Sequence, residues 1–310
     1  MKRNLLCLMV CAALLTLSGC GSSSAPSKKR VAVVVKALDS EFWLAVKSGV
    51  DAAAKEHPDI EVSIMAPQRE IDIDQQVSLI EDQLVRRVSL LVVAPAGVAQ
   101  LTPVLEKAKT QGIRTILVDT DAPWGGKLAF VGTDNFLGGK MAGEFLLKQL
   151  QGKGKIAVIR GVPGVETHES RLAGFRAGLA GQPGIQIVAE QPANSERALA
   201  MTVMENMLTS RKDLDGVFAT SDQMALGALE AIHARTGAKA PLIVAFDAGK
   251  EVLGQIQNGK IAAAVAQLPY QMGYQSVKTA ARALAGESVP ERVDTGVKMV
   301  TRENVAEYVK

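Results

Sequence analysis

The chain has 310 residues, of which 47% are hydrophobic and 22% are charged. This length is sufficient for two domains with complete cores, because domains usually contain about 100–200 residues. The 35 basic and 32 acidic residues give a net charge of +3, so the charge balance indicates neither a nucleic-acid partner nor an anionic surface as partner.

The first residues have the pattern of an export signal. Lys2 and Arg3 precede an apolar run over residues 5–17. This run is shorter than the about 20 residues that an ordinary membrane-spanning helix needs, which favours a secretory signal peptide over residues 1–19. We therefore expect an exported protein.

The apolar run ends in the sequence LSGC, which closes at Cys20 and resembles the lipobox of bacterial lipoproteins. The resemblance implies cleavage before Cys20 and a lipid anchor that holds the protein to a membrane, in the periplasm or at the cell surface. Cys7 and Cys11 lie within the signal, so we expect no disulfide in the mature fold. Residues 20–30 predict a flexible tether. A plain signal peptide or short anchor that merely contains a cysteine is the alternative.

From residue 31 onward, short apolar runs alternate with longer amphipathic segments. Asp39 or Ser40 is placed to cap the first helix. The predicted elements of the first half are, in chain order, strand 31–35, helix 41–57, strand 62–65, helix 74–87, strand 90–94, helix 98–111, strand 114–118 and strand 128–131.

The same alternation continues through the second half. Asp134 and Asp222 each precede a predicted helix and are placed to cap it. The predicted elements here are helix 135–150, strand 155–160, helix 167–180, strand 186–190, helix 196–209, strand 216–219, helix 223–235, strand 242–246, helix 248–258 and strand 261–266.

Alternating strands and helices at this spacing require parallel sheets with helices on both faces. The strands are too many for one sheet, so we predict an α/β fold of two doubly wound parallel-sheet lobes. In such sheets, ligands bind beyond the carboxyl ends of the strands, where the strand order reverses. This rule selects a set rich in charged and amide groups: Lys36, Ala94, Pro95, Asp119, residues 161–171, Ser221, Asp222, Asp247 and Gln267.

Several segments, in this order along the mature chain, resemble the sugar-binding proteins of bacterial ABC importers. This family is the ribose- and allose-binding branch of the type I periplasmic binding proteins. The segments that carry the resemblance are Phe42-Trp43, Thr133-Asp134-Asn135, Arg171 to Phe175, Ser221 to Ala228, Phe246-Asp247 and Ala266 to Pro269.

The resemblance implies two lobes joined by three crossover strands, near residues 131–134, 267–269 and 295–297. The N-terminal lobe is then residues 31–133 plus 268–295. The C-terminal lobe is residues 134–267 plus 296–310. We expect the lobes to close on one ligand.

The resemblance also implies a set of ligand-binding residues. Phe42 and Trp43 match the family's sugar-stacking pair, and flat rings cover the apolar face of a pyranose with little loss of entropy. The matches to its hydroxyl-binding groups are Asp119, Arg171, Asp247 and Gln267. Carboxylates accept hydrogen bonds, a guanidinium donates them and an amide does both, which suits sugar hydroxyls.

Lys36, Thr120 and Ser221 complete the predicted site, at positions where the ribose-binding pattern has other residues. These departures make ribose itself doubtful and leave room for a larger ligand. Lys36 after the first strand, followed by Phe42-Trp43, is more similar to the allose-binding relatives. A hexose such as allose or a close epimer is the favoured ligand.

Structural roles remain open for several of these residues. The Phe42-Trp43 pair also suits a staple between a helix and the sheet. Asp119 and Asp247 also suit helix or turn caps. Arg171 also suits an ion pair with Glu166 or Glu169 on its own helix.

Motifs for enzymatic chemistry are missing from the sequence. His168-Glu169 has no second histidine four residues on, and no P-loop or nucleophile-elbow motif is found. We therefore expect no catalytic residues, no metal and no cofactor.

The function that we expect is reversible capture of a monosaccharide and its delivery to the membrane subunits of an ABC importer. We expect a monomer that binds no nucleic acid. A sugar or polyol receptor module that feeds a chemoreceptor or a sensor kinase is the alternative.

Overall fold

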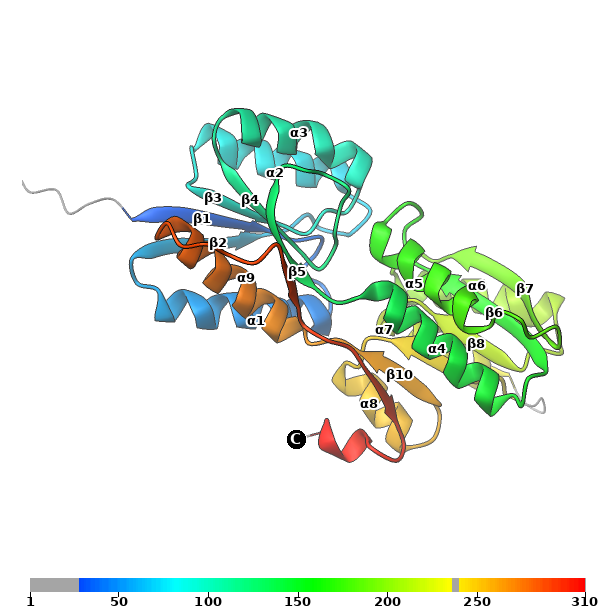
Figure 1. Cartoon of the computed structure of the whole chain (residues 1–310). Coiled ribbons are helices and arrows are strands. Elements are labelled where there is room, and N and C mark those ends of the chain that lie inside the picture. The colour runs from blue at the N-terminus through cyan, green and yellow to red at the C-terminus, as the bar shows by residue number, and fades with distance from the viewer. Residues whose placement is uncertain (1–27, 236–239, 310) are drawn as a thin grey trace, which may run out of the picture.

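The computed structural model describes residues 28–235 and 240–309, which form two α/β lobes side by side (Figure 1). The predicted signal peptide, Cys20 and most of the predicted tether lie outside the described residues. Within the described ranges, no helix is long and apolar enough to cross a membrane.

The N-terminal lobe contains a six-stranded sheet in the order β11-β5-β4-β3-β1-β2, in which each pair is parallel. Its elements are β1 (Lys29–Val34), α1 (Glu41–Glu56), β2 (Ile60–Met65), α2 (Ile73–Val85), β3 (Leu90–Val93), α3 (Val98–Thr110), β4 (Arg114–Val118), β5 (Lys127–Gly132), α9 (Pro269–Leu284) and β11 (Arg292–Asp294).

The C-terminal lobe repeats this arrangement with a sheet in the order β12-β10-β9-β8-β6-β7, in which only β12 runs antiparallel to its neighbour. Its elements are α4 (Asn135–Gln149), β6 (Gly154–Arg160), α5 (Glu166–Gly178), β7 (Ile185–Pro192), α6 (Arg197–Ser210), β8 (Gly216–Ala219), α7 (Asp222–Ala234), β9 (Leu242–Phe246), α8 (Lys250–Gln257), β10 (Ala263–Ala266), β12 (Lys298–Thr301) and the short 3-10 helix η1 (Val305–Glu307).

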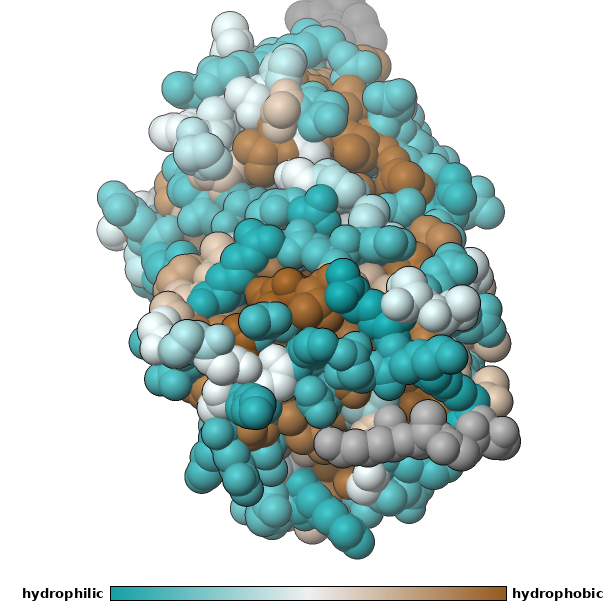
Figure 2. Space-filling view, turned by 90° about the vertical axis from the view of Figure 1, so that its right-hand side faces the viewer, coloured by the Kyte–Doolittle hydropathy of each residue, from teal (hydrophilic) through white to brown (hydrophobic). Residues whose placement is uncertain are grey.

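Both faces of each sheet are covered, which explains the continuous apolar runs of the central strands. Along β1, Val31 and Val33 face the layer of α1 and α9, whereas Ala32 and Val34 face α2 and α3. The C-terminal sheet lies in the same way between α4 and α5 on one face and α6, α7 and α8 on the other. The surface of this lobe turned to the viewer in Figure 2 is mainly hydrophilic, with small hydrophobic areas between charged side chains.

The chain passes from one sheet to the other at three places: after β5, after β10 and between β11 and β12. The first and third crossings touch, because Thr133 Oγ1 lies 3.2 Å from Thr295 Oγ1 and 3.2 Å from the carbonyl oxygen of Gly296. The predicted fold class is therefore confirmed. We propose that the lobes divide at these crossings, with residues 31–133 and 268–295 in one and 134–267 and 296–310 in the other.

The sequence analysis overlooked four elements, namely α9, β11, β12 and the short η1. Helix α9 begins with a proline in its first turn and buries one face, including Met272 and Val277, against α1. Strands β11 and β12 have three and four residues, too few for a periodic pattern to indicate them.

Candidate functional site

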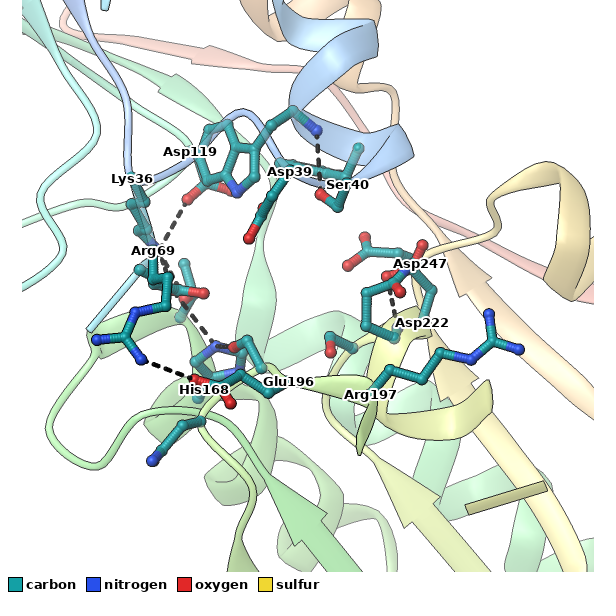
Figure 3. Close-up of a pocket in the computed structure, with 18 of the residues that line it drawn as sticks. Lys36, Asp39, Ser40, Arg69, Asp119, His168, Glu196, Arg197, Asp222 and Asp247 are labelled. Atoms are coloured by element: carbon teal, nitrogen blue, oxygen red, sulfur yellow. Dashed lines mark hydrogen bonds and ion pairs between the residues drawn. The ribbon is translucent and has the colours of Figure 1, made fainter. Parts of the chain in front are cut away.

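A cavity of about 320 Å³ lies between the two lobes. This volume is within the range of about 300–1,000 Å³ that is usual for small-molecule sites. Charged side chains from both lobes surround the open space (Figure 3), with Lys36 and Asp119 on one side and Asp222 and Asp247 on the other. The other lining residues are Asp39, Ser40, Phe42, Trp43, Arg69, Glu70, Thr167, His168, Arg171, Asn194, Ser195, Glu196, Arg197, Ala198, Ser221 and Gln223.

Asp119 and Asp247 occupy equivalent positions in the two lobes, directly after β4 and β9. Each has a left-handed backbone, with φ of 62° at Asp119 and 71° at Asp247. Each N–H donates to the neighbouring strand, Asp119 to the carbonyl of Val131 and Asp247 to that of Val265, both at 2.9 Å. Non-glycine residues rarely adopt this conformation, and such strain concentrates at functional sites.

Lys36 lies two residues after the end of β1. Its side chain is almost fully buried, at 2% exposure. Its Nζ lies 3.1 Å from Asp119 Oδ2 and 3.5 Å from Glu70 Oε1, and it donates to Thr167 Oγ1 of the other lobe at 3.2 Å. Burial opposes ionisation of Glu70, but Lys36 and His168 outweigh it and hold the pKa of Glu70 below its usual range. This side of the cavity is therefore an ion-paired cluster that spans both lobes.

His168 extends the Lys36 cluster into the C-terminal lobe. Its Nδ1 lies 3.0 Å from Thr220 Oγ1, and its Nε2 lies 3.1 Å from Ser195 Oγ and 3.6 Å from Glu70 Oε1. The imidazole is therefore held at both ring nitrogens. Its partner Thr220 is itself held, because Thr220 Oγ1 accepts from the N–H of Gly161 at 3.0 Å.

Arg171 on α5 is fixed from several directions. Its Nε donates to Asn135 Oδ1 and its Nη1 to the carbonyl oxygen of Thr220, both at 2.8 Å, and the guanidinium carbon lies 3.8 Å from the centre of the Phe246 ring. Helix α4 lies close to this point, because a Cβ on Gly139 would be 1.9 Å from the carbonyl oxygen of Arg171. The guanidinium is therefore preorganised, and its Nη1 lies 3.7 Å from Asp247 Oδ2.

Asp222 and Asp247 lie together on the side opposite Lys36 (Figure 3). Burial, then the neighbouring Asp247 carboxylate, raises the pKa of Asp222 to about 7. Burial also raises the pKa of Asp247, although Arg171 and an amide hydrogen bond from Gln267 at 2.7 Å oppose this. These two carboxyl groups are thus less ionised than isolated ones.

Phe42 and Trp43 come from the first turn of α1, where the Ser40 side chain caps the helix by accepting from the N–H of Trp43. The two rings meet edge to face, with centroids 5.0 Å apart. Both line the cavity and both belong to the core between α1 and the sheet. They therefore staple the helix to the sheet and also offer an aromatic wall.

Comparison with known proteins identifies the family. Residues 31–288 match the family model described as periplasmic binding protein domain. The chain belongs to the periplasmic binding protein family. Its members are receptors without enzymatic activity, and the family implies an exported, extracytoplasmic location.

Relatives of this binding protein extend over nearly its whole length. It is 30% identical over 287 residues to the ribose import binding protein RbsB of Escherichia coli, covering 93% of this chain and 95% of that one. It is 32% identical to the D-ribose/D-allose-binding protein of Pseudomonas aeruginosa, with 95% of both chains covered. A solute-binding protein structure from Actinobacillus succinogenes with bound D-allose is 28% identical, with a TM-score of 0.83, and covers 91% of this chain and 100% of that one.

Seven of the nine residues predicted to bind ligand line the cavity of this binding protein: Lys36, Phe42, Trp43, Asp119, Arg171, Ser221 and Asp247. The other two contact lining carboxylates instead. Thr120 donates to Asp119 Oδ2 at 2.7 Å, and Gln267 donates to Asp247.

The structure decides the expected roles of Asp222, Arg171 and Asp134. Ser221, with an extended backbone, is the cap of α7 and accepts from the N–H of Met224, so the prediction that Asp222 caps this helix is wrong. Arg171 pairs with Asp247 rather than with Glu166 or Glu169. The expected capping of α4 by Asp134 is confirmed, because its Oδ1 accepts from the N–H of Leu137.

Sequence reasoning did not select Glu70, Asn194 and Ser195, and it selected His168 and Asp222 at strand ends without predicting that they bind ligand; all five line the cavity. They lie in loops or at helix starts, for which periodicity gives no signal. Within the part of the chain that the structure describes, no group of acidic, histidine and cysteine side chains is arranged to hold a metal ion.

Proposed function

We propose that this protein is the solute-binding component of an ABC importer and captures a monosaccharide between its lobes. The observation that carries the proposal is the convergence of buried donors and acceptors from both lobes on one cavity beside the Phe42-Trp43 wall. A sugar needs both kinds of polar partner and an apolar surface for its ring. The names of the relatives support the same class of ligand.

A hexose with an allose-like arrangement of hydroxyls is the first candidate. One relative is named for both D-ribose and D-allose, and a similar structure contains D-allose. Buried charges on both sides of the cavity make a missing or inverted hydroxyl costly, because its partner would lose a hydrogen bond inside the protein.

The ligand acts as a link between the lobes. Lys36 and Asp119 come from one lobe, whereas Arg171 and Asp247 come from the other. A sugar that contacts both sets does so only when the lobes are together, so binding shifts the population towards the closed form. The membrane subunits then distinguish the closed form from the open one.

A lipid on Cys20 would hold the protein beside its importer. All three cysteines precede residue 21, so Cys20→Ser removes the one thiol expected after cleavage of the signal. We expect this variant to appear in the soluble exported fraction, as followed by fractionation and immunoblotting. Membrane attachment that persists in the variant would remove the anchor from the proposal.

A thermal-shift screen of residues 28–310 against pentoses, hexoses, polyols, sugar acids and nucleosides tests the proposed ligand class. A ligand at 100 times its dissociation constant stabilises the folded state by about 2.7 kcal/mol. We expect one hexose or a close relative to raise the melting temperature. A screen in which every carbohydrate is inactive and another class of compound is active would contradict the proposal.

A further inference from the structure

The two sides of the cavity differ in how their charges are balanced. On one side, the Lys36 ammonium lies within 3.5 Å of both Glu70 and Asp119, and His168 contacts Glu70 as well. On the other side, where Asp222 and Asp247 lie, Arg171 is the one buried cation among the described residues, and its Nη1 is 3.7 Å from Asp247 Oδ2.

Asp222 is a buried carboxylate, at 4% exposure, and within the two described ranges no ion pair joins it to a cation. Its Oδ1 accepts from the N–H of Gln223 at 2.7 Å. Arg197 lies nearby, but its guanidinium is paired with Glu230 and Glu251. The side of the cavity formed by Asp222 and Asp247 therefore carries more negative than positive charge.

A carboxylate from the N-terminal lobe, that of Glu41, approaches Asp222 as well. Glu41 at the start of α1 accepts from the N–H of Lys250 through Oε2. A Cβ added to Gly249 would lie close to both Glu41 Oε2 and Asp222 Oδ2. Glu41 therefore adds acceptor character beside Asp222 when the lobes are together.

Gln267 supplies an independent sign of a missing donor. Its Nε2 donates to Asp247, whereas its Oε1 is buried and has no hydrogen-bond partner among residues 28–235 and 240–309. The residue is 6% exposed and lines a neighbouring cavity of about 340 Å³, which shares Phe42, Asp222 and Asp247 with the central cavity. Buried acceptors normally have a partner, so this oxygen indicates a donor that a ligand brings.

We infer that Asp222, Asp247 and the Gln267 Oε1 form a subsite for a protonated amine, so that the captured carbohydrate is an amino sugar or an amino polyol. The inference rests on the proposed function and specifies its ligand class. An ammonium has three donors and no acceptor, which suits a subsite made of acceptors. A hydroxyl supplies one donor and leaves the surplus charge uncompensated.

The electrostatics support an ammonium in this position. Burial raises the pKa of both Asp222 and Asp247, and the neighbouring Asp247 carboxylate raises that of Asp222 further. A bound cation would stabilise their ionised forms, as opposite charges within about 4–6 Å do. An anionic ligand such as a sugar acid would instead meet two buried carboxylates, whereas Lys36 on the far side is already paired.

Matched ligands test the inference by isothermal titration calorimetry on the purified protein. The pairs are D-glucose with D-glucosamine, D-galactose with D-galactosamine, D-allose with D-allosamine, and myo-inositol with monoamino-inositols. In at least one pair, we expect the amine to bind tenfold or more tightly than its hydroxyl counterpart.

The variant Asp222→Asn tests whether the subsite causes the preference for the amine. We expect this variant to lose most of the preference for the amine, so that the ratio of the dissociation constants of the hydroxyl compound and the amine falls from tenfold or more towards one. Asp82→Asn removes the same charge at an exposed site on α2, and it should keep the preference.

The outcomes separate the two proposals. If hydroxyl compounds bind at least as tightly as the amines in every pair, or if Asp222→Asn keeps the preference, the amine subsite is wrong and sugar capture stands. If neither member of any pair binds, the amine subsite is wrong, and the thermal-shift screen with pentoses and further hexoses decides separately whether sugar capture stands.

Discussion

Asp119 and Asp247 are the same position of the fold in two different surroundings. Both follow the equivalent strand of their sheet, both have positive φ, and both donate their N–H to the next strand. Asp119 lies 3.1 Å from the Lys36 ammonium and accepts from Thr120. Asp247 has its cation at 3.7 Å and a second carboxyl group, Asp222, beside it.

The comparison separates what the backbone determines from what the neighbours determine. The repeated βα architecture places a carboxylate on each side of the cavity, because both strands end at the same edge of their sheets. The neighbouring side chains then decide whether that carboxylate is balanced. One lobe thus offers an ion pair to the ligand, and the other offers a surplus of acceptors.

Removing Arg171 should have the largest effect, because it takes the single buried cation from the Asp247 side. We expect Arg171→Ala to weaken binding of the carbohydrate more than 100-fold and to lower the unfolding free energy by about 3 kcal/mol, as loss of a buried charge partner does. Calorimetry and urea unfolding measure the two effects. Arg176→Ala, on the exposed face of the same helix, is the control, and an Arg171→Ala protein with wild-type affinity would remove Arg171 from the site.

Replacing the two equivalent aspartates should change stability in opposite directions at pH 8. Asp119→Asn takes the closest carboxylate from buried Lys36 and should lower the unfolding free energy by about 2 kcal/mol. Asp247→Asn removes a carboxylate whose ionisation is opposed by burial, and with it the repulsion that acts on Asp222, so it should raise the unfolding free energy by about 1 kcal/mol. Urea unfolding measures both. Shifts of the same sign and size would mean that the two surroundings do not differ as described.

The Asp222 carboxyl should make stability depend on pH. A raised pKa, here to about 7, means that the folded state holds the proton more tightly than the unfolded state, whose ordinary value is 3.8. The wild type therefore loses stability as the pH rises from about 4 to 7. Between pH 5 and pH 8, we expect the stability of Asp222→Asn relative to wild type to rise by about 2–3 kcal/mol.

Thermal unfolding of both proteins across this range measures that difference. The other charged groups that act on Asp222 or on its partner Asp247 are Glu41, Arg171, Asp119 and His168. Their contributions cancel in the comparison with Asp222→Asn to the extent that the variant leaves their positions unchanged. A difference that stays constant with pH would show that Asp222 ionises normally.

The smallest expected effect is optical. Trp43 lines the cavity, whereas Trp124 does not and donates to Glu106 within the N-terminal lobe. In a Trp124→Phe protein, ligand should shift the emission to shorter wavelength, because it displaces water near the Trp43 ring. Emission that is unchanged at saturating ligand would place the sugar away from the aromatic wall.

Much of the fold followed from the sequence because buried parallel strands and amphipathic helices have distinct periods. The rule for strand ends selected Lys36, Asp119 and Asp247, which all line the cavity. Their role in binding stays a prediction.

The remainder depends on tertiary placement. Glu70 and Ser195 come from separate loops to meet His168 in the first turn of α5, and no local pattern specifies the paths of those loops. The cap of α7 was assigned to Asp222 instead of Ser221, although both line the cavity, because a difference of one residue at a helix start decides which side chain caps the helix.

Capture between the lobes is tested most directly by small-angle X-ray scattering, with and without the carbohydrate that binds. The structure has the lobes in contact through Lys36 with Thr167 and through Glu70 with His168. We predict that saturating ligand lowers the radius of gyration of the wild type and leaves that of Arg171→Ala unchanged at the same concentration. A wild-type radius that does not change while calorimetry shows the site to be full would contradict closure around the ligand.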